Sequence, residues 1–123
     1  MRRKSLLSCF SALLIVLVPL CVLAGGYGAI AYSESEDVTG YSYGYNSAQQ
    51  AINSAEARCG KPNCAWKTWF RNACGALAKG SNGILGWDGG LVGRQRAEEA
   101  ALAACRRHGG EDCKIICWAC SHQ

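Results

Sequence analysis

Residues 75–78 read GALA, and residues 28–31, 47 positions earlier, read GAIA. Each copy is followed in the same order by a Gly-rich aromatic segment, an Ala-rich stretch and a short apolar segment that begins with cysteine. The last segments are CAWKTWF from Cys64 and CKIICWAC from Cys113. Matching features in one order predict two copies of one structural unit, over residues 27–71 and 74–120.

Each unit reads strand, strand, helix, strand. In the first helix, apolar side chains recur at helical spacing on one face, at Ala48, Ala51, Ile52, Ala55 and Cys59. The alanines on that face predict that the helix lies close against a sheet. Asn46 is expected to be the N-cap, with Gln49 completing a capping box, and Gly60 is expected to end the helix.

The order of the elements predicts the topology. If the first strand of a unit runs up, the second returns, the helix runs up, and the third strand lies antiparallel beside the first. This gives the strand order 2-1-3 and an α+β fold, cross-linked by disulfides, in which a mainly antiparallel sheet carries two packed helices. Two arrangements remain open, namely one six-stranded sheet or two smaller sheets that face each other.

Residues 1–24 have the features of a secretory signal peptide. Residues 1–4 read MRRK, an uncharged apolar run follows, and small residues suit the cleavage positions before Gly25. Cleavage there would leave residues 25–123 as a single domain. A retained membrane anchor is the alternative, because the run is long enough to span a bilayer. Pro19 and the cleavage site argue against it.

The mature domain is expected to be nearly neutral. The chain has 13 Lys and Arg against 9 Asp and Glu, and three of the basic residues lie in the predicted signal peptide. The remaining basic residues form no stripe. Binding to nucleic acid, or to a membrane after signal cleavage, is therefore not expected.

Seven cysteines remain after the loss of Cys9 and Cys21, and an exported chain this rich in cysteine is expected to form disulfides. The repeat predicts the same cross-link after each helix, and the 2-1-3 order brings the end of the last strand beside the start of the GALA strand. The expected pairs are Cys59–Cys64, Cys105–Cys113 and Cys74–Cys120. Cys117 has Thr68 as its counterpart in the first unit, so it is expected to be a buried, inert free thiol.

The sequence gives less support to zinc binding, haem attachment or dithiol catalysis by the segment CKIICWAC than to disulfide formation. Zinc binding by these cysteines and His122 conflicts with an oxidising compartment, and a c-type haem signal fails because Ser121 intervenes before the histidine. The pair Cys117 and Cys120 forms a Cys-x-x-Cys, but no helix can follow to activate it in the three residues that remain. No metal or other cofactor is therefore expected.

Tyr41, Tyr43 and Tyr45 alternate along the second predicted strand, so a period of two places them on one face. Trp87 occupies the matching strand of the second unit. If the tyrosine face lies under the helix, the rings belong to the core. If it faces water, they form an aromatic patch of the kind that protein partners use. These four residues are the candidate partner-binding residues, and no catalytic residue is predicted.

The pattern YGAIAYS … GYSYGY … ARCG … WFRNACGALA … GWDGG … AEEAALAAC … GGEDCKIICWAC resembles the bacterial exported family called domain of unknown function 4189. The resemblance covers Tyr27 to Cys120, and NACGALA and WAC are its most specific segments. It implies a small secreted or periplasmic protein, in a family where some members look like virulence-associated proteins and others like immunity proteins beside toxins. It implies no catalytic residues.

The sequence favours a small exported, non-catalytic protein that binds another protein in the envelope or outside the cell, as a secreted effector or as an immunity or inhibitor protein. Its expected localisation is periplasmic or secreted. The alternative is a thiol–disulfide redox protein that uses Cys117 and Cys120.

Overall fold

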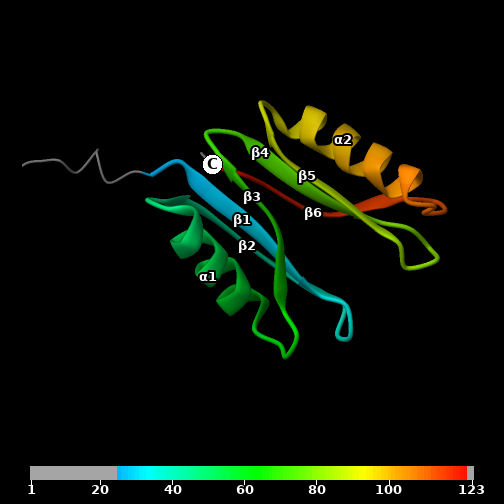
Figure 1. Ribbon diagram of the computed structural model, residues 1–123, viewed down its shortest axis with the longest axis horizontal. Coiled ribbons are helices and arrows are strands. Elements are labelled where there is room, and N and C mark those ends of the chain that lie inside the picture. The colour runs from blue at the N-terminus through cyan, green and yellow to red at the C-terminus, as the bar shows by residue number, and fades with distance from the viewer. Residues whose placement is uncertain (1–24, 122–123) are drawn as a thin grey trace, which may run out of the picture.

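The computed structural model describes residues 25–121 (Figure 1). In chain order the elements are β1 (Tyr27–Ser33), β2 (Val38–Tyr45), α1 (Ala48–Cys59), β3 (Ala65–Arg71), β4 (Cys74–Lys79), β5 (Leu85–Leu91), α2 (Arg94–Arg107) and β6 (Lys114–Cys120). The strand-strand-helix-strand order predicted for each unit is confirmed. The predicted signal peptide lies outside the described residues, within which no helix is long and apolar enough to cross a membrane.

Two antiparallel three-stranded sheets face each other, and one helix covers the outer face of each sheet (Figure 1). The strand orders are β2-β1-β3 and β5-β4-β6, which is the predicted 2-1-3 order in both units. Contacts between the sheets join β2 to β6 and β3 to β5. The α+β fold built from two repeats is confirmed, and of the two open arrangements the protein has facing sheets rather than one six-stranded sheet.

The alternation within GAIA and GALA explains why the sheets face each other. Ile30 and Leu77 point into the core between the sheets, where they meet Tyr32 and Phe70, and all four side chains are at most 1% exposed. The flanking alanines of β1 and β4 point the other way, toward α1 and α2. A single six-stranded sheet with both helices on one face would leave the large apolar side chains in water.

Glycine beneath each helix allows the close approach that the alanines predict. A Cβ at Gly40 in β2 would collide with backbone atoms of Cys59 in α1, and a Cβ at Gly86 in β5 would collide with the equivalent atoms of Cys105 in α2. A backbone cannot move aside as a flexible side chain does. Glycine is therefore required at the same place in both units.

The start of α1 differs from the prediction by one residue. Ser47, at φ −150°, is the N-cap, and its hydroxyl accepts a hydrogen bond of 3.1 Å from the backbone N–H of Gln50. The predicted capping box of Asn46 and Gln49 is wrong because β2 stays paired as far as Tyr45, which delays the helix. Gly60, in the left-handed conformation at φ 68°, ends the helix as predicted.

Bulges interrupt the edge strands and change which residues share a face. In β2 the bulge lies at residues 43–44, with Gly44 at φ 80°, and in β3 it lies at Lys67. The second unit repeats both irregularities, at Gly90 in β5 and at Ile116 in β6. Because a bulge inserts one extra residue, the residues beyond it turn to the opposite face.

Candidate functional site

Three disulfides cross-link the protein, and each one lies within a single unit. They join Cys59 to Cys64, Cys105 to Cys113 and Cys74 to Cys120. The first two tie the end of each helix to the start of the next strand, with nearly equal Cα–Cα distances of 6.1 and 6.2 Å. The third joins directly opposed residues of β4 and β6. These are the pairs expected from the repeat and the strand order.

The remaining thiol, Cys117, lies in the core between the sheets, opposite Leu77, and is 8% exposed. Burial raises the pKa of Cys117 to about 11, and a hydrogen bond with Thr39 only partly opposes that rise. The thiolate is the reactive form of cysteine. Since Cys120 is bonded to Cys74 and Cys117 is held as a thiol, the Cys-x-x-Cys forms no reactive dithiol in this structure.

Tyr41 and Tyr43 lie together on the edge strand β2. Each residue is 42% exposed, and their rings stack with centroids 6.4 Å apart and planes 16° apart. Tyr41 is opposite Ile30, so both rings lie on the sheet face that looks toward the second sheet. A groove of about 290 Å³ lies beside them, lined by Thr39, Tyr41, Ile116, Cys117 and Trp118. We call this surface, Tyr41 and Tyr43 with the groove, the tyrosine edge.

The prediction that all three tyrosines share one face is wrong for Tyr45. The bulge at residues 43–44 turns Tyr45 to the face covered by α1, where its hydroxyl and the hydroxyl of Ser54 form a hydrogen bond of 2.8 Å. Trp87 is 40% exposed but lies opposite Leu77 on β5, beside Lys67 of β3. Trp87 and the tyrosine edge lie at opposite sides of the sandwich, because β5 faces β3 whereas β2 faces β6.

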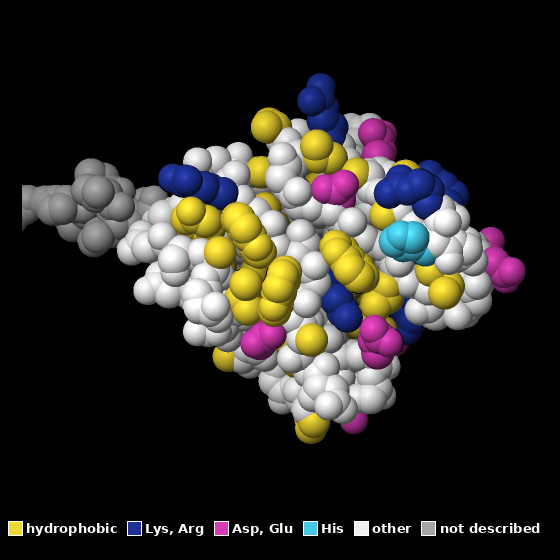
Figure 2. Space-filling model, viewed as in Figure 1, with side chains coloured by type: hydrophobic (Ala, Val, Ile, Leu, Met, Phe, Trp, Pro, Cys, Tyr) yellow, Lys and Arg dark blue, Asp and Glu magenta, His cyan; other side chains and the backbone are white. Residues whose placement is uncertain are grey.

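A second aromatic surface, which the alternation of residues in the sequence does not predict, lies on β3. Trp66 and Trp69 of β3 are 46% and 44% exposed, and the ring of Tyr27 lies 5.9 Å from that of Trp69. Figure 2 shows hydrophobic side chains gathered over β3 and β5 on this side of the molecule. In a regular strand, residues three apart point to opposite faces, whereas the bulge at Lys67 places both tryptophans on one face. We call Tyr27, Trp69 and Trp66 the tryptophan stripe.

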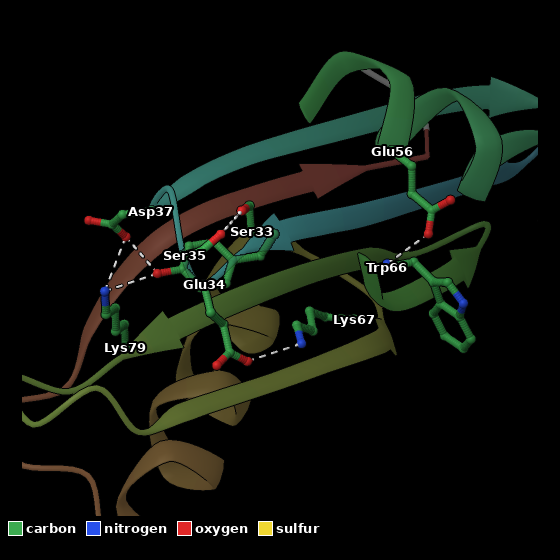
Figure 3. Close-up of polar contacts among 9 residues, drawn as sticks. Ser33, Glu34, Ser35, Asp37, Glu56, Trp66, Lys67 and Lys79 are labelled. Carbon is green, nitrogen blue, oxygen red and sulfur yellow. Dashed lines mark hydrogen bonds and ion pairs between the residues drawn. The ribbon is translucent and has the colours of Figure 1, made fainter. Parts of the chain in front are cut away.

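A polar cluster links the two units at one end of the sandwich (Figure 3). The hydroxyl of Tyr32 donates a hydrogen bond of 2.6 Å to Asp37, and the ammonium of Lys79 lies 2.9 Å from that hydroxyl and 3.1 Å from the Asp37 carboxylate. Burial, followed by the bond to Asp37, raises the pKa of Tyr32. The hydrogen bond to Tyr32, followed by the bond to Asp37, raises the pKa of Lys79. The hydrogen bond from Tyr32, followed by the bond from Lys79, lowers the pKa of Asp37.

These pKa shifts hold each group of the cluster in its ordinary protonation state. A phenol with a raised pKa is a weaker nucleophile, and an ammonium with a raised pKa is a weaker source of a free amine. The cluster is therefore a structural cross-link between the β1–β2 turn and β4. Among residues 25–121, no group of three or more His, Cys, Asp or Glu side chains is placed to hold a metal ion.

Comparisons with known proteins agree with this fold. The profile of a family described as "Domain of unknown function (DUF4189)" matches residues 27–120. The NMR structure of Rv1813c from Mycobacterium tuberculosis is similar, with 28% sequence identity and a TM-score of 0.55, over 98% of this chain and 94% of that chain. No curated protein matches the chain.

Proposed function

Because the chain belongs to the DUF4189 family, whose description names no activity, we propose from its surface that it is a small exported, non-catalytic protein that binds another protein. The tyrosine edge is the proposed contact. The observation that carries the proposal is the stacked pair of Tyr41 and Tyr43, each 42% exposed, on an open strand edge beside a groove.

Stacked, half-exposed tyrosines suit protein recognition for physical reasons. A tyrosine offers a large apolar ring with a polar tip and loses little side-chain entropy when it is ordered. Tyr41 and Tyr43 already restrain each other by stacking, so part of that entropy is lost before a partner arrives. The adjacent groove has Ile116, 36% exposed, on its wall and supplies further apolar contact area.

Export is supported by the cysteines and by the predicted signal peptide. Three disulfides indicate an oxidising compartment, and residues 1–24 carry the pattern of a secretory signal. We propose a periplasmic or secreted location and a role as an effector, or as an immunity or inhibitor protein. The redox alternative is disfavoured, because Cys117 is a buried thiol of raised pKa and Cys120 is already paired.

Site-directed photo-crosslinking tests the proposal. A photoreactive phenylalanine analogue replaces Tyr43 in one variant and Gln49, on the exposed face of α1, in a matched control. The proposal predicts a discrete crosslinked protein from position 43 that is absent from position 49. The identified partner should then bind Tyr43→Ala about 30-fold more weakly than wild type, the loss expected for an aromatic hot spot. Equal crosslinking from both positions, or equal affinity of Tyr43→Ala, would refute it.

A further inference from the structure

The repeat provides an internal comparison for the tryptophan stripe. Trp69 and Trp118 occupy the same position, opposite Ala29 in β1 and opposite Ala76 in β4. The ring of Trp118 is covered by the guanidinium of Arg94, 4.0 Å from its centroid. When the two helices are aligned on their cysteines, the residue equivalent to Arg94 is Ala48, whose side chain is too short to reach the ring. Trp69 is left 44% exposed.

The stripe is a row of rings rather than a compact patch. Trp69 and Trp66 lie opposite Ala29 and Ala31, which are two residues apart in β1, a spacing of about 7 Å along a strand. Tyr27 extends the row at the other end, 5.9 Å from Trp69. Two rings along the edge strand β3, with Tyr27 beside them on the central strand β1, suit an elongated ligand with flat apolar faces, repeated at about the length of one pyranose ring.

The edge of β3 is blocked against the addition of a peptide strand. The backbone N–H of Trp66 donates a hydrogen bond of 3.0 Å to a carboxylate oxygen of Glu56 in α1, as Figure 3 shows. The bulge at Lys67 further disturbs the ladder one residue later. A ligand of the stripe therefore has to use the faces of the rings, not backbone pairing.

Charges around the stripe are balanced. The guanidinium of Arg71 lies 5.2 Å from the centroid of the Tyr27 ring at one end, and the carboxylate of Glu56 lies at the other end, beside Trp66. Lys67, paired with Glu34 at 3.4 Å, points to the other face of the sheet, toward Trp87. One positive and one negative group, at the two ends of the stripe, leave no net charge there to attract a polyanion or a polycation. An uncharged ligand fits this surface.

From these four observations we infer that the tryptophan stripe binds a neutral polysaccharide, an extended chain of β-linked pyranoses. The C–H faces of successive sugars stack on Trp69 and Trp66, since the face of an aromatic ring is negative and attracts weakly positive hydrogens. The half-buried ring of Tyr27, with the Arg71 guanidinium over it, bounds the stripe at one end. Arg71 donates hydrogen bonds to sugar hydroxyls at one end. Glu56 accepts from them at the other, because its carboxylate has acceptor sites beyond the one used by Trp66.

Calorimetric titration with cellohexaose and chitohexaose tests the inference and distinguishes a glucan from an N-acetylated source. At least one of them should bind wild type, and Trp69→Ala and Trp66→Ala should each bind it about tenfold more weakly, as when one stacking ring is lost for other flat ligands. Tyr43→Ala, an equally exposed aromatic on the tyrosine edge, is the matched control and should bind the oligosaccharide like wild type. Thermal melts confirm that each variant is folded.

Three outcomes would overturn the inference. The first is that neither hexasaccharide binds, and the second is that the tryptophan variants bind as wild type does. The third is that wild type binds neutral phosphatidylcholine vesicles in a Trp69-dependent way and ignores both sugars, which would assign the stripe to a lipid surface. None of these outcomes bears on protein binding at the tyrosine edge, because Tyr43→Ala reports on that surface separately.

Discussion

Removal of the Cys74–Cys120 disulfide by the double substitution Cys74→Ala/Cys120→Ala should destabilise the protein more than removal of either other bridge. The three bridges span sequence separations of 46, 5 and 8 residues. On the chain-entropy model these separations correspond to about 4.0, 2.1 and 2.5 kcal/mol at 25 °C. The double substitution should therefore lower the free energy of unfolding by about 4 kcal/mol, and the melting temperature by about 15–30 °C for a domain of this size.

Urea unfolding followed by far-UV circular dichroism measures these differences. Cys59→Ala/Cys64→Ala is the matched control, because it also removes one disulfide and introduces two alanines, and it should cost about half as much. Each double substitution removes both sulfurs of its bridge, so every variant has the same single free thiol as wild type, Cys117. The reasoning is refuted if the Cys59–Cys64 variant is destabilised as much as the Cys74–Cys120 variant, since loop length would then not set the order.

Three further outcomes are expected. Gly86→Ala should lower the free energy of unfolding by about 1–3 kcal/mol in urea titrations, because its Cβ would overlap the backbone of Cys105; wild-type stability would contradict the close helix packing. Tyr32→Phe removes the hydrogen bond to Asp37, so the pKa of Asp37 should rise toward its ordinary 3.8 in a carboxyl NMR titration. The difference in the free energy of unfolding between wild type and Tyr32→Phe should shrink as the pH falls below 3.8 and Asp37 becomes protonated. The free energy of unfolding should fall from pH 9 to 11, by about 1.4 kcal/mol at pH 10, because the unfolded chain releases the Cys117 proton and the native state, with a pKa of about 11, retains it. Cys117→Ala should lack this part of the pH dependence.

The repeat made most of the fold predictable. Once GAIA and GALA are aligned, the strand order, the helices and the positions of the six paired cysteines follow from one unit applied twice. The choice between one sheet and two depended on a feature of the same residues, namely that Ile30 and Leu77 point away from the helices. A second apolar face on each sheet requires a second cover, and the other unit is the cover available.

The candidate surfaces were harder to predict because bulges break the period of two. Strict alternation would place Tyr45 on the same face as Tyr43 and would place Trp66 and Trp69 on opposite faces. One inserted residue in each strand moves Tyr45 to the other face and brings the two tryptophans onto one face. Gly44 gave a local signal for the first bulge, since glycine readily adopts positive φ. Nothing about Lys67 itself distinguishes it from a regular strand residue. The sequence signal for the exposure of Trp69 lies in the repeat, where Ala48 stands at the position of Arg94, the residue that covers Trp118.

Alkylation of the native, oxidised protein tests most directly the central claim that its cysteines are structural rather than a thiol–disulfide centre. A thiol reagent is added at pH 8 before and after unfolding without reductant, and the modified residues are mapped by mass spectrometry. We expect no rapid modification of the folded protein, because burial and the raised pKa of Cys117 suppress its thiolate. After unfolding we expect one modified residue, Cys117. Rapid modification of both Cys117 and Cys120 in the folded protein would contradict the account and favour thiol–disulfide chemistry.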